Sequence, residues 1–75
     1  MSGIEIANRA LEMLYCSGKT ESADKLRRHI GKDYIVLGLG DIDWDIELAL
    51  EQVGGYDCIY VGNNLIGKFY FNKEY

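Results

Sequence analysis

The sequence predicts a small α+β fold with the element order helix, helix, strand, helix, strand, strand. Three observations lead to it: apolar residues recur at helical spacing over residues 4–30, a continuous apolar run of strand length covers residues 34–39, and two β-rich segments at 56–61 and 65–72 enclose a turn sequence. A chain of 75 residues has room for one core, since at this size folding buries only roughly 60% of the unfolded surface. We therefore expect residues 1–75 to form a single compact domain.

The N-terminus carries the signals of a helix start. Ser2 followed by Glu5 fits a capping box, in which each side chain satisfies a free backbone donor of the other residue. Gly18 is placed to end this helix, which should run to about Tyr15. The apolar residues at helical spacing are Ile4, Ala7, Leu11 and Leu14.

A second helix, short and basic on its outer side, is expected next. Thr20 can cap its start, and Gly31 can end it in a left-handed conformation. Its apolar line consists of Ala23, Leu26 and Ile30.

The apolar run at 34–39 leads into a third helix. Such a run is typical of a strand that is covered on both faces. Asp41 or Asp43 can cap the helix, which should end at Gly54 and Gly55. We expect this helix to join two parallel strands by a right-handed crossover, in a three-stranded sheet whose last strand is antiparallel at one edge.

The last two strands should form a hairpin, because Gly62, Asn63 and Asn64 tolerate positive φ. Strand alternation places Ile59, Val61, Leu65, Phe69 and Phe71 on one face, and Tyr56, Cys58, Tyr60, Ile66, Lys68 and Tyr70 on the other. Burial of the tyrosine face beneath the first two helices is the favoured interpretation. If that face is open, it is a secondary candidate surface, formed by Tyr56, Tyr60, Lys68 and Tyr70.

Charge and composition restrict the function classes. Net charge is −4, and it is unevenly divided: residues 1–32 carry six bases and four acids, whereas residues 33–75 carry two bases and eight acids. Cys16 and Cys58 have no metal-ligand spacing and are expected to be buried reduced thiols. No apolar stretch is long enough to span a bilayer and no targeting segment is evident, so a cytoplasmic protein without a membrane partner is expected.

Catalytic and ligand motifs are incomplete. Gly38 and Gly40 lie where nucleotide-binding loops occur, but Asp43 stands in place of the third glycine. The acids at 41, 43 and 45 resemble the opening of a calcium loop, yet Ile46 and Gln52 occupy its glycine and glutamate positions. The only histidine, at position 29, is explained as a donor at a helix end. We expect no enzyme, no cofactor and no metal site.

The third helix is the leading candidate surface. A helical wheel over residues 43–53 places Ile46, Ala49, Leu50 and Val53 toward the sheet, and Trp44, Glu47, Leu48 and Glu51 on the opposite arc. Glu47 lies one turn from both Asp43 and Glu51, and such like-charge pairs are unfavourable in a helix. The candidate partner-binding residues are Asp43, Trp44, Asp45, Glu47, Leu48 and Glu51.

Two interpretations of Trp44 and Leu48 remain open. In the structural one, the N-terminal helices cover both residues and the acids form a solvated rim. In the functional one, both residues form an exposed apolar anchor, and the surrounding negative charge suits a basic partner.

The second helix offers a rival surface. Lys25, Arg28 and Lys32 are spaced to form a positive stripe beside Arg27, and the helix pair is similar to a helix-turn-helix arrangement. A pI near 4.7 opposes direct nucleic-acid binding, and a solvated helix face explains the same bases.

These observations favour a non-catalytic inhibitor or adaptor that binds a basic protein surface through its acidic helix. In size, acidity and lack of catalytic motifs the chain is similar to phage-encoded inhibitors such as anti-CRISPR proteins, which act on nucleic-acid-binding complexes; this similarity covers no motif. The alternatives are a small DNA-binding or regulatory module using the second helix, and a homo-oligomer formed through the tyrosine face or the open edge of the last strand, where Lys68 and Lys73 are the only obvious protection.

Overall fold

A computed structural model of the chain describes residues 1–37, 44–54, 57–61 and 64–75, with side-chain environments for 1–37, 44–54 and 67–75. Its helices are α1 (Gly3–Cys16), α2 (Thr20–His29) and α3 (Trp44–Val53), and its strands are β1 (Tyr34–Leu37), β2 (Asp57–Val61) and β3 (Asn64–Tyr70). The predicted α+β class is confirmed. The expected caps Asp41 and Asp43, the loop glycines at 38 and 40, and the turn residues at 62 and 63 lie outside the described residues.

The sheet has the strand order β1-β3-β2, with β3 antiparallel to both neighbours. Ile35 pairs with Phe69, and Leu37 pairs with Gly67. The predicted edge position of the last strand is therefore wrong. The two strands that flank α3, β1 and β2, run parallel to each other as predicted, because both are antiparallel to β3, but β3 lies between them. The physical reason lies in β3, whose Phe69 is fully buried: a central position lets this apolar strand pair on both sides.

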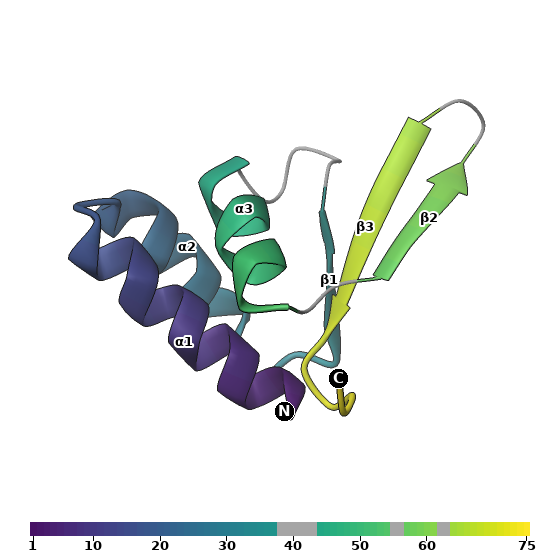
Figure 1. Cartoon of the computed structure of the whole chain (residues 1–75), viewed down its shortest axis with the longest axis horizontal. Coiled ribbons are helices and arrows are strands. Elements are labelled where there is room, and N and C mark those ends of the chain that lie inside the picture. Colours follow the sequence, from purple (N-terminus) through teal and green to yellow (C-terminus); the bar gives the residue numbers. More distant parts are fainter. Residues whose placement is uncertain (38–43, 55–56, 62–63) are drawn as a thin grey trace.

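The helices lie together on one side of the sheet (Figure 1). Burial alternates along β1, where Ile35 and Leu37 are buried but Tyr34 is 47% exposed. The expectation that this strand is covered on both faces is wrong for the described residues, because the helices supply cover to one face only. The buried apolar core consists of Ile6, Ala7, Ala10, Leu14, Ala23, Leu26, Ile35, Leu37, Ile46, Ala49, Leu50, Phe69 and Phe71.

The sequence predicts the start of α1 correctly but not the start of α2. At the start of α1, the Ser2 hydroxyl accepts a hydrogen bond from the Glu5 backbone N–H at 3.2 Å, as the capping box predicts. Gly18 follows α1 with φ 76°. The prediction for α2 was wrong at its start, because Lys19 occupies the N-cap position without a side-chain cap and Thr20 is already helical.

The start of α1 is fastened to the end of β3 and the residues that follow it. The Gly3 backbone N–H donates to the Lys73 carbonyl at 2.7 Å. A β-carbon at Gly3 would overlap the carbonyl oxygen of Tyr70 and lie 2.5 Å from that of Phe71. The two chain ends lie side by side (Figure 1), with the Tyr75 N–H donating to the Met1 carbonyl at 2.8 Å. Only a glycine lets the helix approach the strand this closely.

Candidate protein-binding surface on helix α3

Trp44 is the most exposed large apolar side chain among the described residues, at 68%. It is the first residue of α3. The N-terminal helices therefore do not cover it. Leu48, one turn further along, is half-buried and belongs to the lining of a pocket between α3 and α1. The two residues that the sequence grouped together thus differ: one is open to solvent and the other is partly sheltered.

The core-facing side of α3 follows the predicted pattern. Ile46, Ala49 and Leu50 are buried, and Val53 packs partly buried against the core. Their burial fixes the rotation of the helix, so the opposite arc points away from the sheet. That arc holds Trp44 together with Glu47 and Glu51.

The acids of α3 occupy different environments. Glu51 is exposed, whereas Glu47 and Asp45 are half-buried. The Asp45 carboxylate lies 3.9 Å from the Lys19 ammonium. Asp43, the remaining predicted acid of this surface, lies outside the described residues. No lysine or arginine occurs within α3 itself, so the helix presents a predominantly negative surface around Trp44.

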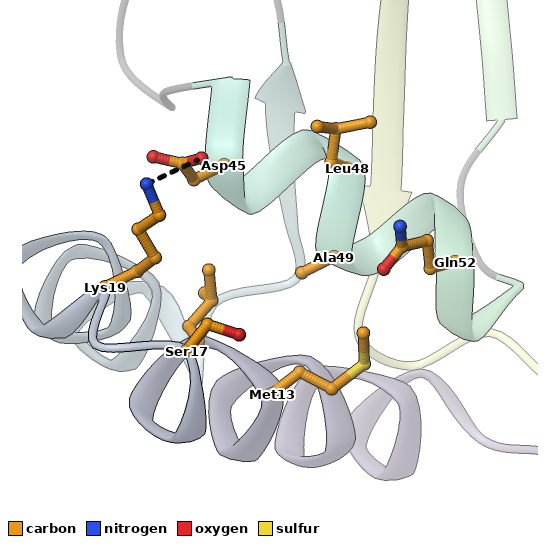
Figure 2. Close-up of a pocket in the computed structure, with 8 residues that line it drawn as sticks. Met13, Ser17, Lys19, Asp45, Leu48, Ala49 and Gln52 are labelled. Carbon is orange, nitrogen blue, oxygen red and sulfur yellow. Dashed lines mark ion pairs between the residues drawn. The ribbon is translucent and has the colours of Figure 1, made fainter.

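A small pocket of about 150 Å³ lies between α3 and α1. In Figure 2 the Lys19–Asp45 pair stands at one end, and Met13 approaches Gln52 at the other. Leu48 contributes to the α3 side of the lining. The complete lining is Met13, Leu14, Ser17, Lys19, Asp45, Leu48, Ala49 and Gln52.

Sequence reasoning missed the contribution of α1 to this site. Met13 is 36% exposed and lines the pocket from the α1 side. A second, wider hollow of about 530 Å³ shares Met13 and Gln52 with the first and includes Cys16. Cys16 is exposed, so its predicted burial is wrong; the side chain of Cys58 lies outside the described part. The only signal in the sequence was an apolar residue, Met13, on the outer side of α1. Such a residue does not by itself identify a binding partner.

The secondary candidate surface is partly described. Tyr34 and Tyr70 pack with ring centroids 5.6 Å apart, and the Lys68 ammonium lies 5.4 Å from the Tyr34 ring centroid. The helices cover the phenylalanine face instead, so the predicted burial of the tyrosine face beneath them is wrong for these residues. Tyr60 is registered opposite Leu65; its side chain, like all of Tyr56, lies outside the described part.

The basic stripe predicted for the second helix and the open edge predicted for the last strand both differ from the structure. The second helix ends at His29, so Lys32 lies beyond it and the stripe with Lys25 and Arg28 does not continue along one helix. Arg27 and Arg28 are exposed. The open edge predicted for the last strand is not present, because β3 lies between β1 and β2.

Beside Arg28, the Asp24 carboxylate accepts a hydrogen bond from the Tyr15 hydroxyl at 2.8 Å. This hydrogen bond raises the pKa of Tyr15, with desolvation and the negative charge of Asp24 acting in the same direction. The Arg28 Nε donates to the backbone carbonyl of Asp24 at 3.2 Å. Part of the basic surface is therefore engaged with α2 itself.

Within the described residues, no three His, Cys, Asp or Glu side chains converge as a metal site. None of the described helices combines the length and apolar character needed to cross a membrane. No protein family, curated protein or solved structure matches the chain.

Proposed function

We propose that this chain is a non-catalytic protein-binding inhibitor or adaptor whose helix α3 docks onto a basic protein surface. The observation that carries the proposal is the 68% exposure of Trp44 on a helix without basic residues. Fully burying a large apolar side chain contributes roughly 1.5–3 kcal/mol, and this gain is available to a partner. Tryptophan is also among the residues that most often dominate interface energetics.

The charge around Trp44 supports a basic partner. Glu47 and Glu51 follow Trp44 at the spacing that places residues along one side of a helix. Negative charge beside an apolar anchor steers a positive surface into contact and disfavours acidic competitors. Because nucleic-acid-binding proteins carry such positive surfaces, the proposed partner class includes proteins that otherwise hold nucleic acid. The similarity in size and acidity to phage-encoded inhibitors such as anti-CRISPR proteins agrees with this class.

Capture from an extract of the native host tests the proposal. The tagged chain should retain a protein with a basic surface, and both added salt and added nucleic acid should release it. The variant with Glu47→Lys and Glu51→Lys should lose that protein. A variant with Glu21→Lys and Glu74→Lys has the same change in net charge at exposed positions outside α3 and should retain it. Equal retention by both variants would overturn the proposal.

A further inference from the structure

The outer face of the sheet, on the side away from the helices, presents a pair of tyrosines. Tyr34 on β1 and Tyr70 on β3 are register partners, and their ring centroids lie 5.6 Å apart. Tyr34 is 47% exposed and Tyr70 is half-buried, whereas their strand neighbours Ile35 and Phe69 are buried. Among the described residues, no helix covers the tyrosine pair (Figure 1). Tyrosine is enriched at protein interfaces because its ring buries apolar area while its hydroxyl can stay hydrated.

We propose that this outer face packs against the same face of a second copy of the chain and forms a symmetric dimer. In a two-fold dimer both copies offer the same residues, so the face must complement itself. Sheets that pack face to face lie about 10 Å apart, which lets side chains of the two inner surfaces interdigitate. The inference goes beyond the proposed function, because it concerns the side of the sheet opposite α3.

Charged residues at the two ends of the tyrosine pair make the face complementary to itself. Lys68 precedes Tyr70 by two residues on β3, and its ammonium lies 5.4 Å from the centroid of the Tyr34 ring. On its other side, Tyr70 borders a hollow of about 360 Å³ that is also lined by Asp33 and Asn72. There the Asn72 amide donates to the Asp33 carboxylate at 3.3 Å. A cation therefore lies at one end of the pair and a carboxylate at the other.

Lys73 also borders this hollow, but its ammonium is placed by a different contact. It lies 5.1 Å from the centroid of the Tyr75 ring. Tyr75 in turn stacks on Phe69, which belongs to the buried side of β3. We therefore assign the exposed Asp33 carboxylate as the group that receives a cation of the second copy.

These positions select one arrangement of the two copies. Lys68 lies about 7 Å from Tyr70 along the strand, in the direction opposite to the hollow. A two-fold axis that crosses the strands at Tyr70 therefore brings Lys68 of each copy to Asp33 of the other. Lys68 also lies on the central strand, between Val36 and Asp57 in the register. An axis parallel to the strands would thus bring the two Lys68 side chains together, and like charges across an interface repel.

Charge reversal tests this dimer. Sedimentation equilibrium of the full chain from about 10 µM to about 1 mM should show a dimer fraction that rises with concentration, as expected for an interface of modest area. Lys68→Glu and Asp33→Lys should each weaken dimerisation about tenfold or more, because each places like charges opposite one another. The chain with both reversals should dimerise within about threefold of the unmodified chain, since the ion pair is restored with opposite sign.

Arg27→Glu is the matched control. It changes the net charge as much as Lys68→Glu does, at an exposed position of α2, and should leave dimerisation unchanged. Thermal unfolding followed by circular dichroism shows that each variant is folded at the temperature of the sedimentation experiment.

A monomer mass over the whole concentration range would overturn the inference, and so would a dimer that neither single reversal weakens. If the combined reversals failed to restore the dimer, Lys68 and Asp33 would not meet across it, which would also overturn the inference. Partner capture should be the same for the monomeric variants, because α3 lies on the other side of the sheet. The proposed function is judged separately, by loss of the partner on reversal of Glu47 and Glu51.

Discussion

The Lys19 ammonium lies 3.9 Å from the Asp45 carboxylate and joins the N-cap of α2 to the first turn of α3. The two side chains are 53% and 39% exposed, so water and salt screen their attraction. Exposed pairs of this kind contribute roughly 0–1 kcal/mol. The pair therefore lies at one end of the pocket and contributes little to the stability of the fold.

Replacing this lysine tests that interpretation. Lys19→Ala should lower the free energy of unfolding by less than about 1 kcal/mol in urea denaturation. It should also strengthen partner binding at low salt, since Asp45 is no longer balanced by Lys19 and can attract the basic partner. Weaker binding by this variant at low salt would contradict the assigned role of the acids.

Trp44→Ala should weaken partner binding with little effect on the stability of the fold. Because the side chain is 68% exposed, its removal should change the free energy of unfolding by less than about 1 kcal/mol. Partner affinity should fall about tenfold or more, as is typical of a tryptophan anchor. Calorimetric titration with the captured partner gives the affinity, and thermal unfolding gives the stability. Tyr34→Ala is the control for an exposed aromatic residue on the opposite side of the sheet; if it weakened binding equally, Trp44 would not be the anchor.

The close approach of α1 to β3 makes Gly3 intolerant of a side chain. Gly3→Ala should destabilise the chain by about 1–3 kcal/mol, because the added methyl group meets the carbonyls of Tyr70 and Phe71. Asn8→Ala, at an exposed position of the same helix, should be neutral or slightly stabilising, since alanine favours helix. Urea denaturation of both variants checks the contrast. Equal stability of the two would show that α1 does not approach the strand so closely.

The raised pKa of Tyr15 predicts a loss of stability in alkaline solution. The ordinary value is 10.0, and the folded chain holds the hydroxyl proton more tightly because it is donated to Asp24. The stabilisation is therefore present below the unfolded pKa and is lost as the pH rises through the folded pKa. Tyr15→Phe should make the decline in stability above about pH 10 shallower. Denaturation of both chains across this range measures it, and identical profiles would contradict the assignment.

Local signals predicted much of the helical framework. The spacing of Ser2 and Glu5 gave the correct start of α1, since capping depends on residues that are adjacent in sequence. The period of Ile46 and Leu50 gave the buried side of α3. The start of α2 was misplaced by one residue. Threonine is a common N-cap residue, so Thr20 was predicted to cap the helix, but Lys19 is the N-cap and Thr20 is the first helical residue.

Long-range contacts explain what the sequence could not predict. The central position of β3 depends on the pairing of Ile35 with Phe69, which no local pattern encodes. A helical wheel shows that Trp44 and Leu48 point away from the sheet, but it does not identify the neighbouring helix. The packing of α1 beside α3 places Met13 in the lining of the same pocket as Leu48, while Trp44 stays exposed.

The most direct test of the central claim compares two charge-reversal variants against the captured partner. One carries Glu47→Lys and Glu51→Lys, and the other carries Glu21→Lys and Glu74→Lys, so the change in net charge is identical. We expect the α3 variant to lose binding by about a hundredfold or more, since two close charge pairs across an interface contribute several kcal/mol together, and the control to bind within about threefold of the unmodified chain. Equal affinities of the two variants would show that overall charge, and not helix α3, determines recognition.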